Sequence, residues 1–163
     1  MKFPLNYISL KKNVVACAIF LIFSAIPTYG QLSKSIIIHE YIPIPSADGT
    51  ILASSLALPD SEGPFPTMII RTPYGNRKNK GMLERFAQLG YACLIQDTRG
   101  RYDSGGYFAP FIHGIEDGEA TLKWVRSQPW SSGIICARGH SYPGFTSLYL
   151  AAGDEEPPAA VVA

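Results

Sequence analysis

The sequence predicts an α/β fold, in which a leading β-hairpin is followed by parallel strands that alternate with helices. Two observations predict it. Short apolar, β-branched-rich runs, typical of strands buried on both faces, recur along the chain. Stretches with apolar residues at helical spacing follow the later runs. Such alternation favours right-handed β-α-β units, whose functional loops lie at the carboxyl ends of the strands. The 163 residues allow at most one domain.

The individual elements follow from local signals. Asp48-Gly49 is a strong hairpin turn between two extended stretches, and Pro59 to Pro66 is a Pro- and Gly-rich loop. Breakers end each predicted helix, namely Gly90, Pro129 and Gly153. The predicted elements are strands at 36–44, 50–58 and 67–70, a helix at 79–89, a strand at 91–96, a helix ending near Arg126, a strand at 134–137, a helix after Ser141, and the start of a further strand at 159–163.

Residues 1–30 have the pattern of a secretory signal peptide. Two lysines precede an apolar run from Val14 to Ile26, and small residues near Gly30 suit a signal peptidase, so Gln31 is the expected new N-terminus. The run is shorter than the about 20 apolar residues of a membrane span; an uncleaved anchor is the alternative. We expect a secreted or periplasmic protein without a stable membrane span, whose domain occupies residues 31–163.

Composition argues against polyanion binding. The formal net charge is +1 and 17% of residues are charged. Three of the 14 basic residues lie in the predicted leader, which leaves 11 basic against 13 acidic residues and no basic patch. We therefore predict no nucleic-acid partner. The histidines and cysteines are scattered and no phosphate-loop spacing occurs, so we predict no cofactor and no metal. The sequence does not specify an oligomeric state.

Ser141 stands where the strand at 134–137 turns sharply into a helix. A serine at such a turn is the nucleophile elbow of α/β-hydrolases. The turn lifts the hydroxyl above the sheet and directs the next backbone N–H, that of Tyr142, toward the same point, where the helix N-terminus adds positive charge. The alternative is a serine that only caps the helix. The apolar residues that mark the helix are Phe145, Leu148, Tyr149 and Ala152.

The chain also resembles a known family across nearly all of residues 40–163. The matching segments are 48–53 (DGTILA), 71–74 (RTPY), 90–92 (GYA), 97–100 (DTRG), 104–108 (SGGYF), 116–118 (EDG), Trp124, 128–130 (QPW) and 139–144 (GHSYPG). In this order they are similar to the N-terminal part of the cocaine esterase / X-Pro dipeptidyl-peptidase group, the S15-like or CocE/NonD hydrolases. The family's elbow has the form G-x-S-Y-x-G, which accounts for Pro143 in place of a second glycine. The resemblance implies the N-terminal part of an α/β-hydrolase fold, ending just after the elbow helix.

The resemblance implies three catalytic residues. Ser141 is the nucleophile, and Tyr74 donates its phenol O–H to the oxyanion beside the backbone N–H of Tyr142. The chemistry agrees, because a phenol with a pKa of ~10 stays a donor at neutral pH, and Pro73 restricts the turn. The alternative for Tyr74 is a half-buried loop aromatic that serves packing.

The other polar residues are expected to serve structure. A base must contact the serine hydroxyl at ~2.6–3.2 Å, and His140 is an immediate neighbour whose side chain diverges, so we expect it to lie beneath the elbow. We expect His113 at the surface or as a helix cap. Asp97, Arg99 and Asp103 are expected to form a polar network near the site. Glu116 and Asp117 are expected to favour the dipole of the helix they open.

The implied strand order also separates the two cysteines that follow the leader. The strand at 67–70 is expected to lie between those of Cys93 and Cys136. Second-neighbour strands are ~9.6 Å apart, whereas a disulfide needs Cα atoms within about 7 Å. We therefore expect two free thiols.

Together these expectations predict a secreted serine hydrolase. It would cleave an ester or amide bond, acyl or dipeptidyl, of a small molecule or peptide through an acyl-enzyme on Ser141. The alternative is an incomplete or non-catalytic chain, because elbow hydrolases carry their acid and histidine after the serine. The residues after Ser141 contain no histidine. The chain alone is then expected to be inactive, and its apolar run at 159–163 to promote aggregation.

Overall fold

The computed structural model describes residues 35–153 and 155–163. The predicted leader and its cleavage site lie outside this part of the chain. In the described residues six strands form one mixed sheet with the order β1-β2-β4-β3-β5-β6. The strands are β1 (Ile36–Pro45), β2 (Ile51–Pro59), β3 (Phe65–Thr72), β4 (Ala92–Asp97), β5 (Ser131–Arg138) and β6 (Ala160–Val162). The helices are the 3₁₀ turn η1 (Asn76–Asn79), α2 (Lys80–Gln88), α3 (Gly114–Arg126) and α4 (Tyr142–Leu150).

The predicted α/β arrangement is confirmed. Strands β1 and β2 form the leading antiparallel hairpin, and β2 pairs antiparallel with β4. Strand β3 runs parallel to β4 and β5, and β6 runs parallel to β5. The hairpin turn follows from Asp48-Gly49: Gly49 has φ 81°, and the Asp48 carboxylate accepts the Thr50 N–H at 3.0 Å. This positive φ suits glycine because it has no Cβ to clash.

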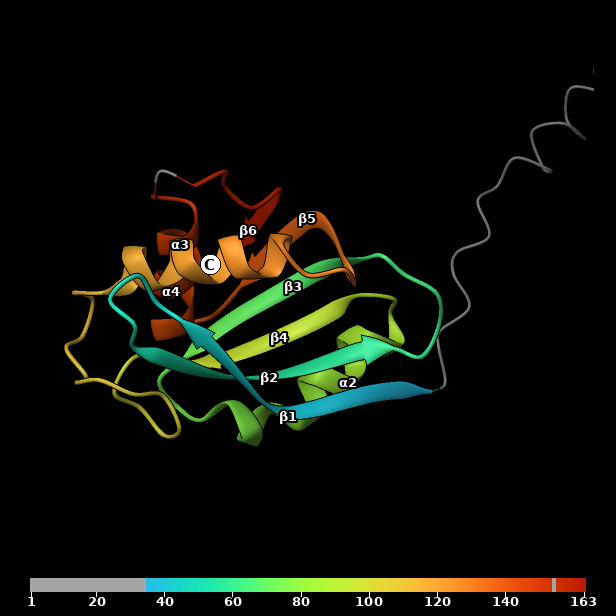
Figure 1. The fold of residues 1–163 in the computed structure, drawn as a ribbon, viewed down its shortest axis with the longest axis horizontal. Coiled ribbons are helices and arrows are strands. Elements are labelled where there is room, and N and C mark those ends of the chain that lie inside the picture. The colour runs from blue at the N-terminus through green and yellow to red at the C-terminus, as the bar shows by residue number, and fades with distance from the viewer. Residues whose placement is uncertain (1–34, 154) are drawn as a thin grey trace, which may run out of the picture. The chain divides into compact units, whose positions relative to one another are not determined.

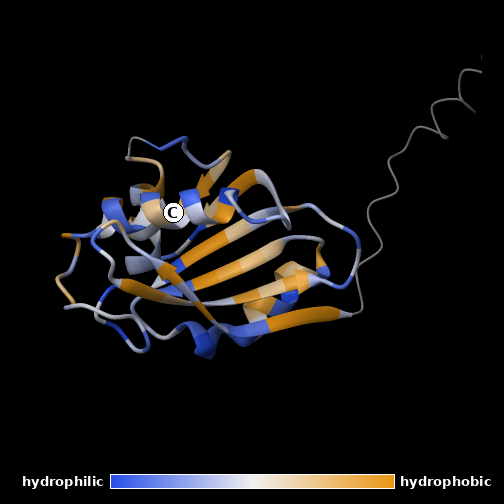
Figure 2. Cartoon of the chain, in the orientation of Figure 1, coloured by the Kyte–Doolittle hydropathy of each residue, from blue (hydrophilic) through white to orange (hydrophobic). Residues whose placement is uncertain are grey.

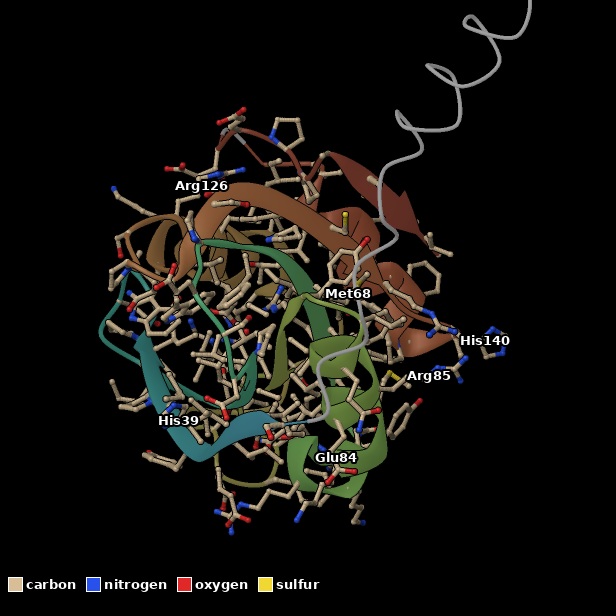
Figure 3. The ribbon with its side chains drawn as sticks, turned by 90° about the vertical axis from the view of Figure 1, so that its right-hand side faces the viewer. His39, Met68, Glu84, Arg85, Arg126 and His140 are labelled. Carbon is tan, nitrogen blue, oxygen red and sulfur yellow. The ribbon has the colours of Figure 1, made fainter. Side chains whose placement is uncertain are left out.

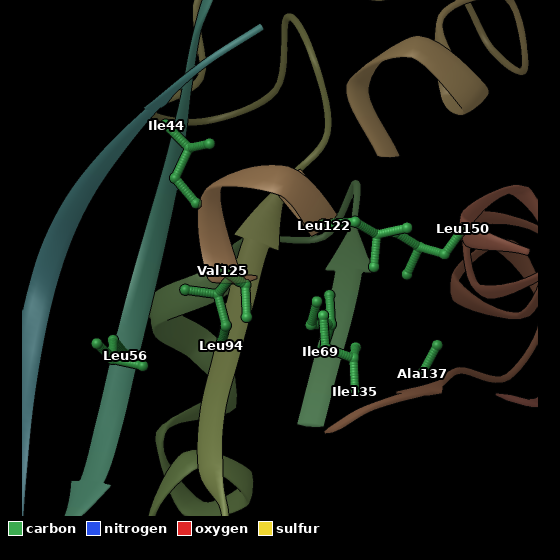
Figure 4. Packing of buried hydrophobic residues seen from close by; sticks show 9 residues of the cluster. All are labelled: Ile44, Leu56, Ile69, Leu94, Leu122, Val125, Ile135, Ala137 and Leu150. Atoms are coloured by element: carbon green, nitrogen blue, oxygen red, sulfur yellow. The ribbon is translucent and has the colours of Figure 1, made fainter. Parts of the chain in front are cut away.

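Helices cover both faces of the sheet (Figure 1). On one face α2 packs through Leu83 and Ala87 against a cluster that includes Ile70 and Ile95. On the other face α3 and α4 pack on the central strands (Figure 4). The central strands are accordingly hydrophobic along most of their length, while polar residues gather in the loops (Figure 2). The cluster on the α3 and α4 face contains Ile44, Leu56, Ile69, Leu94, Leu122, Val125, Ile135, Ala137 and Leu150.

The cysteines lie as the expected strand order requires. Met68 of β3 pairs with Cys93 of β4 on one side and with Cys136 of β5 on the other. Both cysteines are free, Cys93 buried and Cys136 half-buried. Burial disfavours a thiolate and raises the pKa of Cys93 to about 12.

One local prediction was wrong, and one was confirmed without its buried face. Strand β3 begins at Phe65, inside the predicted loop, because the Phe65 N–H donates to the Trp130 carbonyl at 2.8 Å and extends the ladder toward β5. Helix α4 forms as predicted, but Phe145 and Leu148 are 53% and 51% exposed, while Thr146 of the same helix is 2% exposed. Its apolar spacing therefore predicted the helix without predicting its buried face.

Candidate active site

Ser141 lies between the end of β5 and the start of α4 with the strained backbone of a sharp turn. Its φ is 61° and its ψ is −125°, values that a residue with a side chain rarely adopts. Gly139 makes the turn possible, because a Cβ there would lie 2.0 Å from the carbonyl carbon and oxygen of Pro143. Ser141 is exposed, and within the described residues it makes no side-chain capping bond to α4. The capping alternative therefore has no support in the geometry.

Tyr142 places a backbone donor beside Ser141. It is the first residue of α4, where an N–H has no partner within the helix. The carbonyl of Ser141 accepts the N–H groups of Gly144 and Phe145 at 2.9 and 3.2 Å, which fixes the first turn. The Tyr142 ring stacks on Phe111 with centroids 4.8 Å apart, and its hydroxyl accepts the Phe111 N–H at 3.4 Å. The first turn of α4 is thus fixed by hydrogen bonds to the Ser141 carbonyl and by the contacts between Tyr142 and Phe111.

Tyr74 follows the carboxyl end of β3 and is 53% exposed. Its loop is fixed by short contacts. The Tyr74 N–H donates to Thr72 Oγ1 at 3.2 Å, and Arg101 Nε donates to the Pro73 carbonyl at 3.0 Å. Asn76, the first residue of η1, is buried, and its N–H donates to Asp97. The side chain is therefore solvent-accessible on a rigid backbone.

A pocket of about 450 Å³ is lined by Tyr74 and by Gly139, His140 and Pro143, which flank Ser141; Ser141 and Tyr142 themselves do not line it. Two of the predicted site segments line it, the turn after β3 and the elbow before α4. A hollow of about 540 Å³ between the β1–β2 turn and α3 includes neither, so we place the candidate site at the smaller pocket. That pocket is lined by Ile70, Thr72, Tyr74, Asn79, Met82, Arg138, Gly139, His140, Pro143, Val162 and Ala163.

The three histidines do not form a base for Ser141 in this part of the chain. His140 is exposed and its ring points away from the ribbon (Figure 3), so the expectation that it lies beneath the elbow was wrong. The strained turn sends its side chain outward to the pocket rim. His113 occupies the N-cap position of α3, where its Nδ1 lies 3.3 Å from Glu116 Oε2. His39 is exposed on β1, the edge strand.

A buried ion cluster joins α3 to the hairpin turn. Arg99 binds both oxygens of Asp117, at 2.6 Å from Nη2 and 3.2 Å from Nε, and its guanidinium also binds Asp48. The hydrogen bonds to Asp117 and then Asp48 raise the pKa of Arg99 further above its ordinary value. Asp117 is 1% exposed, so its charge requires such partners. The expectation that Asp117 acts through the helix dipole therefore missed its main role.

Arg71 extends this cluster toward the elbow helix. Its side chain is 1% exposed, and its Nη2 lies 3.7 Å from Asp117 Oδ2. Arg71 also donates to Gln96 Oε1 at 2.9 Å and to the Gly114 carbonyl at 2.7 Å. Burial lowers the pKa of Arg71 to about 10, although Asp117 acts in the opposite direction. The strand that leads to Tyr74 is thereby tied to the start of α3.

Asp97 serves the Tyr74 loop separately from Arg99. Its two carboxylate oxygens accept the Asn76 N–H at 2.6 Å and the Asn76 side-chain amide at 2.8 Å. Burial raises the pKa of Asp97. Asp103 pairs with Arg77 at 2.6 Å. The Asp103 N–H also donates to Asp97 at 3.5 Å, as the predicted network requires, but Arg99 binds Asp48 and Asp117 instead. Sequence proximity does not indicate which long-range groups meet.

Among the described residues no group of three or more histidine, cysteine and acidic side chains is arranged to hold a metal ion. The helices of the same residues are too short or too polar to cross a bilayer.

The sheet order, the helices on both faces and the strained serine between β5 and α4 define the N-terminal part of an α/β-hydrolase fold. The chain belongs to the X-Pro dipeptidyl-peptidase (S15) family, whose model matches residues 48–163. The resemblance seen in the sequence is thus confirmed.

Individual relatives agree with this assignment. The chain is 38% identical over 117 residues to a cocaine esterase from Rhodococcus sp. (strain MB1 Bresler), covering 68% of this chain and 20% of that protein. It superposes on an α-amino acid ester hydrolase with a TM-score of 0.66 and 25% identity, over 81% of this chain and 25% of the other. A CocE/NonD family hydrolase from Staphylococcus aureus superposes with a TM-score of 0.66 and 22% identity, over 73% of this chain and 25% of the other, and has the same fold. The chain thus spans about a fifth of the curated relative.

Proposed function

We propose that this chain supplies the nucleophile and the oxyanion donors of a serine hydrolase that cleaves an ester or amide bond through an acyl-enzyme on Ser141. The main support is the backbone of Ser141, with φ 61° between a buried strand and a helix N-terminus. A residue held in such a conformation is typical of a functional site. The similarity to a cocaine esterase supports an acyl substrate.

The oxyanion donors are proposed to be the Tyr74 hydroxyl and the Tyr142 N–H. Both come from segments fixed before any substrate arrives: the Tyr74 loop by Thr72, Asn76 and their partners, and Tyr142 by Phe111. Donors that need no reorganisation stabilise a developing negative charge most strongly. In the reaction, the Ser141 oxygen would attack the substrate carbonyl, and the two donors would bind the oxygen that becomes negative.

The base and its carboxylate are proposed to come from residues other than those described. His140 points outward, and the His113 ring pairs with Glu116. The 163 residues alone are therefore expected to hydrolyse p-nitrophenyl acetate no faster than buffer does. Saturable turnover by this chain that is lost in Ser141→Ala would contradict the assignment, because one of its own histidines would then be the base.

The decisive test uses the protein expressed from its full gene and a fluorophosphonate probe. We expect the probe to label Ser141, and Ser141→Ala to lose both labelling and turnover, since removing a triad member costs several orders of magnitude. Ser147→Ala is the matched control, because it removes a buried hydroxyl from the same helix. Labelling that survives Ser141→Ala would overturn the proposal. Tyr74→Phe should lower kcat by about 10²–10³ with little change in KM.

Export is proposed on the sequence pattern of residues 1–30 alone. A protein recovered from the medium or the periplasm should begin at Gln31. Intact mass or N-terminal sequencing would establish this, and a secreted form that retains Met1 would contradict it.

A further inference from the structure

Thr146 is a buried threonine of α4, a helix that exposes Phe145 and Leu148 and buries Leu150. It is 2% exposed, whereas its neighbour Phe145 is 53% exposed. Its Oγ1 donates to the Arg71 carbonyl at 2.7 Å, across 75 residues of chain. Burying the polar Thr146 side chain while Phe145 and Leu148 remain exposed gives up hydrophobic free energy. The arrangement therefore indicates that the bond to Arg71 matters to this helix.

The Thr146 hydroxyl has a second acceptor within reach, the Pro143 carbonyl at 3.0 Å. A hydroxyl carries one hydrogen, so it donates fully to one acceptor at a time. The Pro143 carbonyl already accepts the Ser147 hydroxyl at 2.8 Å. The shorter contact and the otherwise satisfied Pro143 both favour Arg71 as the acceptor.

The Arg71 carbonyl lies where β3 loses one of its neighbours. Pairing of β3 with β5 ends at Ile69 opposite Ala137, whereas pairing with β4 continues to Thr72. Thr146 contacts the strand two residues beyond that end. The hydrogen bond thus joins the carboxyl end of strand β3 directly to helix α4, which begins after Ser141.

The chain between this bond and each proposed oxyanion donor is short and rigid. Tyr74 is three residues after Arg71, and its N–H folds back on Thr72. Tyr142 is four residues before Thr146 and lies one helical turn away on the same helix. A fixed Thr146–Arg71 contact therefore fixes the separation of the Tyr74 loop and the Tyr142 N–H.

We propose that Thr146 is a positioning residue that holds the two halves of the oxyanion hole, the Tyr74 hydroxyl and the Tyr142 N–H, at their working separation. This inference rests on the proposed function, because it concerns the same oxyanion. It adds a residue that touches neither substrate nor nucleophile and acts through a strand-to-helix hydrogen bond. Displacements of about 1 Å at a catalytic group can cost about 10²-fold in rate.

The test compares three variants of the full-gene protein on an activated ester. Thr146→Val keeps the shape and removes the hydroxyl, Thr146→Ser keeps the hydroxyl, and Ser147→Ala removes a buried hydroxyl bonded only within the helix. We expect Thr146→Val to lower kcat about 10-fold or more with KM within about twofold, and the other two to stay within about threefold. Equal losses in Thr146→Val and Ser147→Ala would overturn the proposal, because a general helix defect would explain both.

A double-mutant cycle with Tyr74→Phe tests the mechanism itself. If Thr146 acts by placing the phenol, Thr146→Val should lower kcat by less than about twofold once the phenol is gone. If the kcat loss of the double variant equals the product of the losses of Thr146→Val and Tyr74→Phe, the two residues act independently and the inference is refuted. If Thr146→Val does not fold, Thr146→Ala replaces it in the same cycle. Tyr74→Phe with wild-type kcat would instead refute the proposed oxyanion role, so the two failures are distinguishable.

Discussion

Helices α2 and α4 are of equal length and lie on opposite faces of the sheet, yet they use their residues differently. Helix α2 buries Leu83 and Ala87 in the core, as its apolar spacing predicts. Helix α4 exposes Phe145 and Leu148 and buries Thr146. Helix α4 also buries Leu150 at its end, so the difference lies in its first part, which is held by a polar contact to the end of β3, whereas α2 is organised by hydrophobic burial. Two predictions test this comparison, and a third tests the ion cluster that joins α3 to the hairpin turn.

The largest difference is expected between two glycines. Gly139→Ala puts a Cβ against the Pro143 backbone at 2.0 Å, which the turn before α4 cannot accept without moving. We expect it to destabilise the protein by about 3 kcal/mol or more. Gly81→Ala in α2 meets nothing within 4 Å, and should be neutral or stabilise by up to about 1 kcal/mol through helix propensity. Urea unfolding followed by circular dichroism measures both.

The glycine comparison also has a functional readout. Gly139→Ala should lose fluorophosphonate labelling in the full-gene protein, whereas Gly81→Ala should label as the wild type does. A stable, fully labelled Gly139→Ala would mean that the close approach at the elbow is not required.

The second prediction compares two leucines. Leu83 of α2 is 2% exposed, so Leu83→Ala should leave a cavity and cost about 2–4 kcal/mol. Leu148 of α4 is 51% exposed, so Leu148→Ala should change the free energy of unfolding by no more than about 0.5 kcal/mol. Equal costs for the two variants, measured by urea unfolding, would show that α4 is also held by its apolar residues.

The fold could be predicted because its signals are local. Apolar runs, the Asp48-Gly49 turn and helix breakers lie within a few residues of the structure that they specify. The same holds for the elbow, where Gly139, Ser141 and the following helix are contiguous. In the helix predicted at 79–89, Met82, Leu83, Phe86 and Ala87 recur at helical spacing on one face, and this face packs against the core because apolar periodicity reports apolar contacts directly.

The polar partners could not be predicted because they join distant parts of the chain. Arg99 meets Asp48 across 51 residues, and Thr146 meets Arg71 across 75. Nothing in the local sequence of Thr146 distinguishes it from a surface threonine. The buried face of α4 mixes Thr146 and Ser147 with Leu150, so its apolar periodicity does not report which side faces the sheet.

The smallest effect is expected at the edge of the ion cluster, where Asp48 binds Arg99 on the α3 and α4 face. The hydrogen bond from Arg99, aided by the Thr50 N–H, lowers the pKa of Asp48 below its ordinary value. A carboxylate whose folded pKa is depressed contributes stability that is present above the unfolded pKa of about 4 and is lost as pH falls toward the folded pKa. Asp97 acts in the opposite sense, because burial raises its pKa. The dependence of wild-type stability on acid pH therefore combines the contributions of Asp48 and Asp97.

The variant Asp48→Asn isolates the contribution of Asp48. Its Tm should lie slightly below that of the wild type from pH 5 to 8, and the difference should shrink as pH falls below about 4. The effect is small because the Asp48 side chain is 55% exposed and solvent screens the pair. Arg99 keeps Asp117 in the variant, so the cluster itself should persist. A Tm difference that stays constant down to pH 2 would show that Asp48 stabilises the turn through its shape and not through its charge.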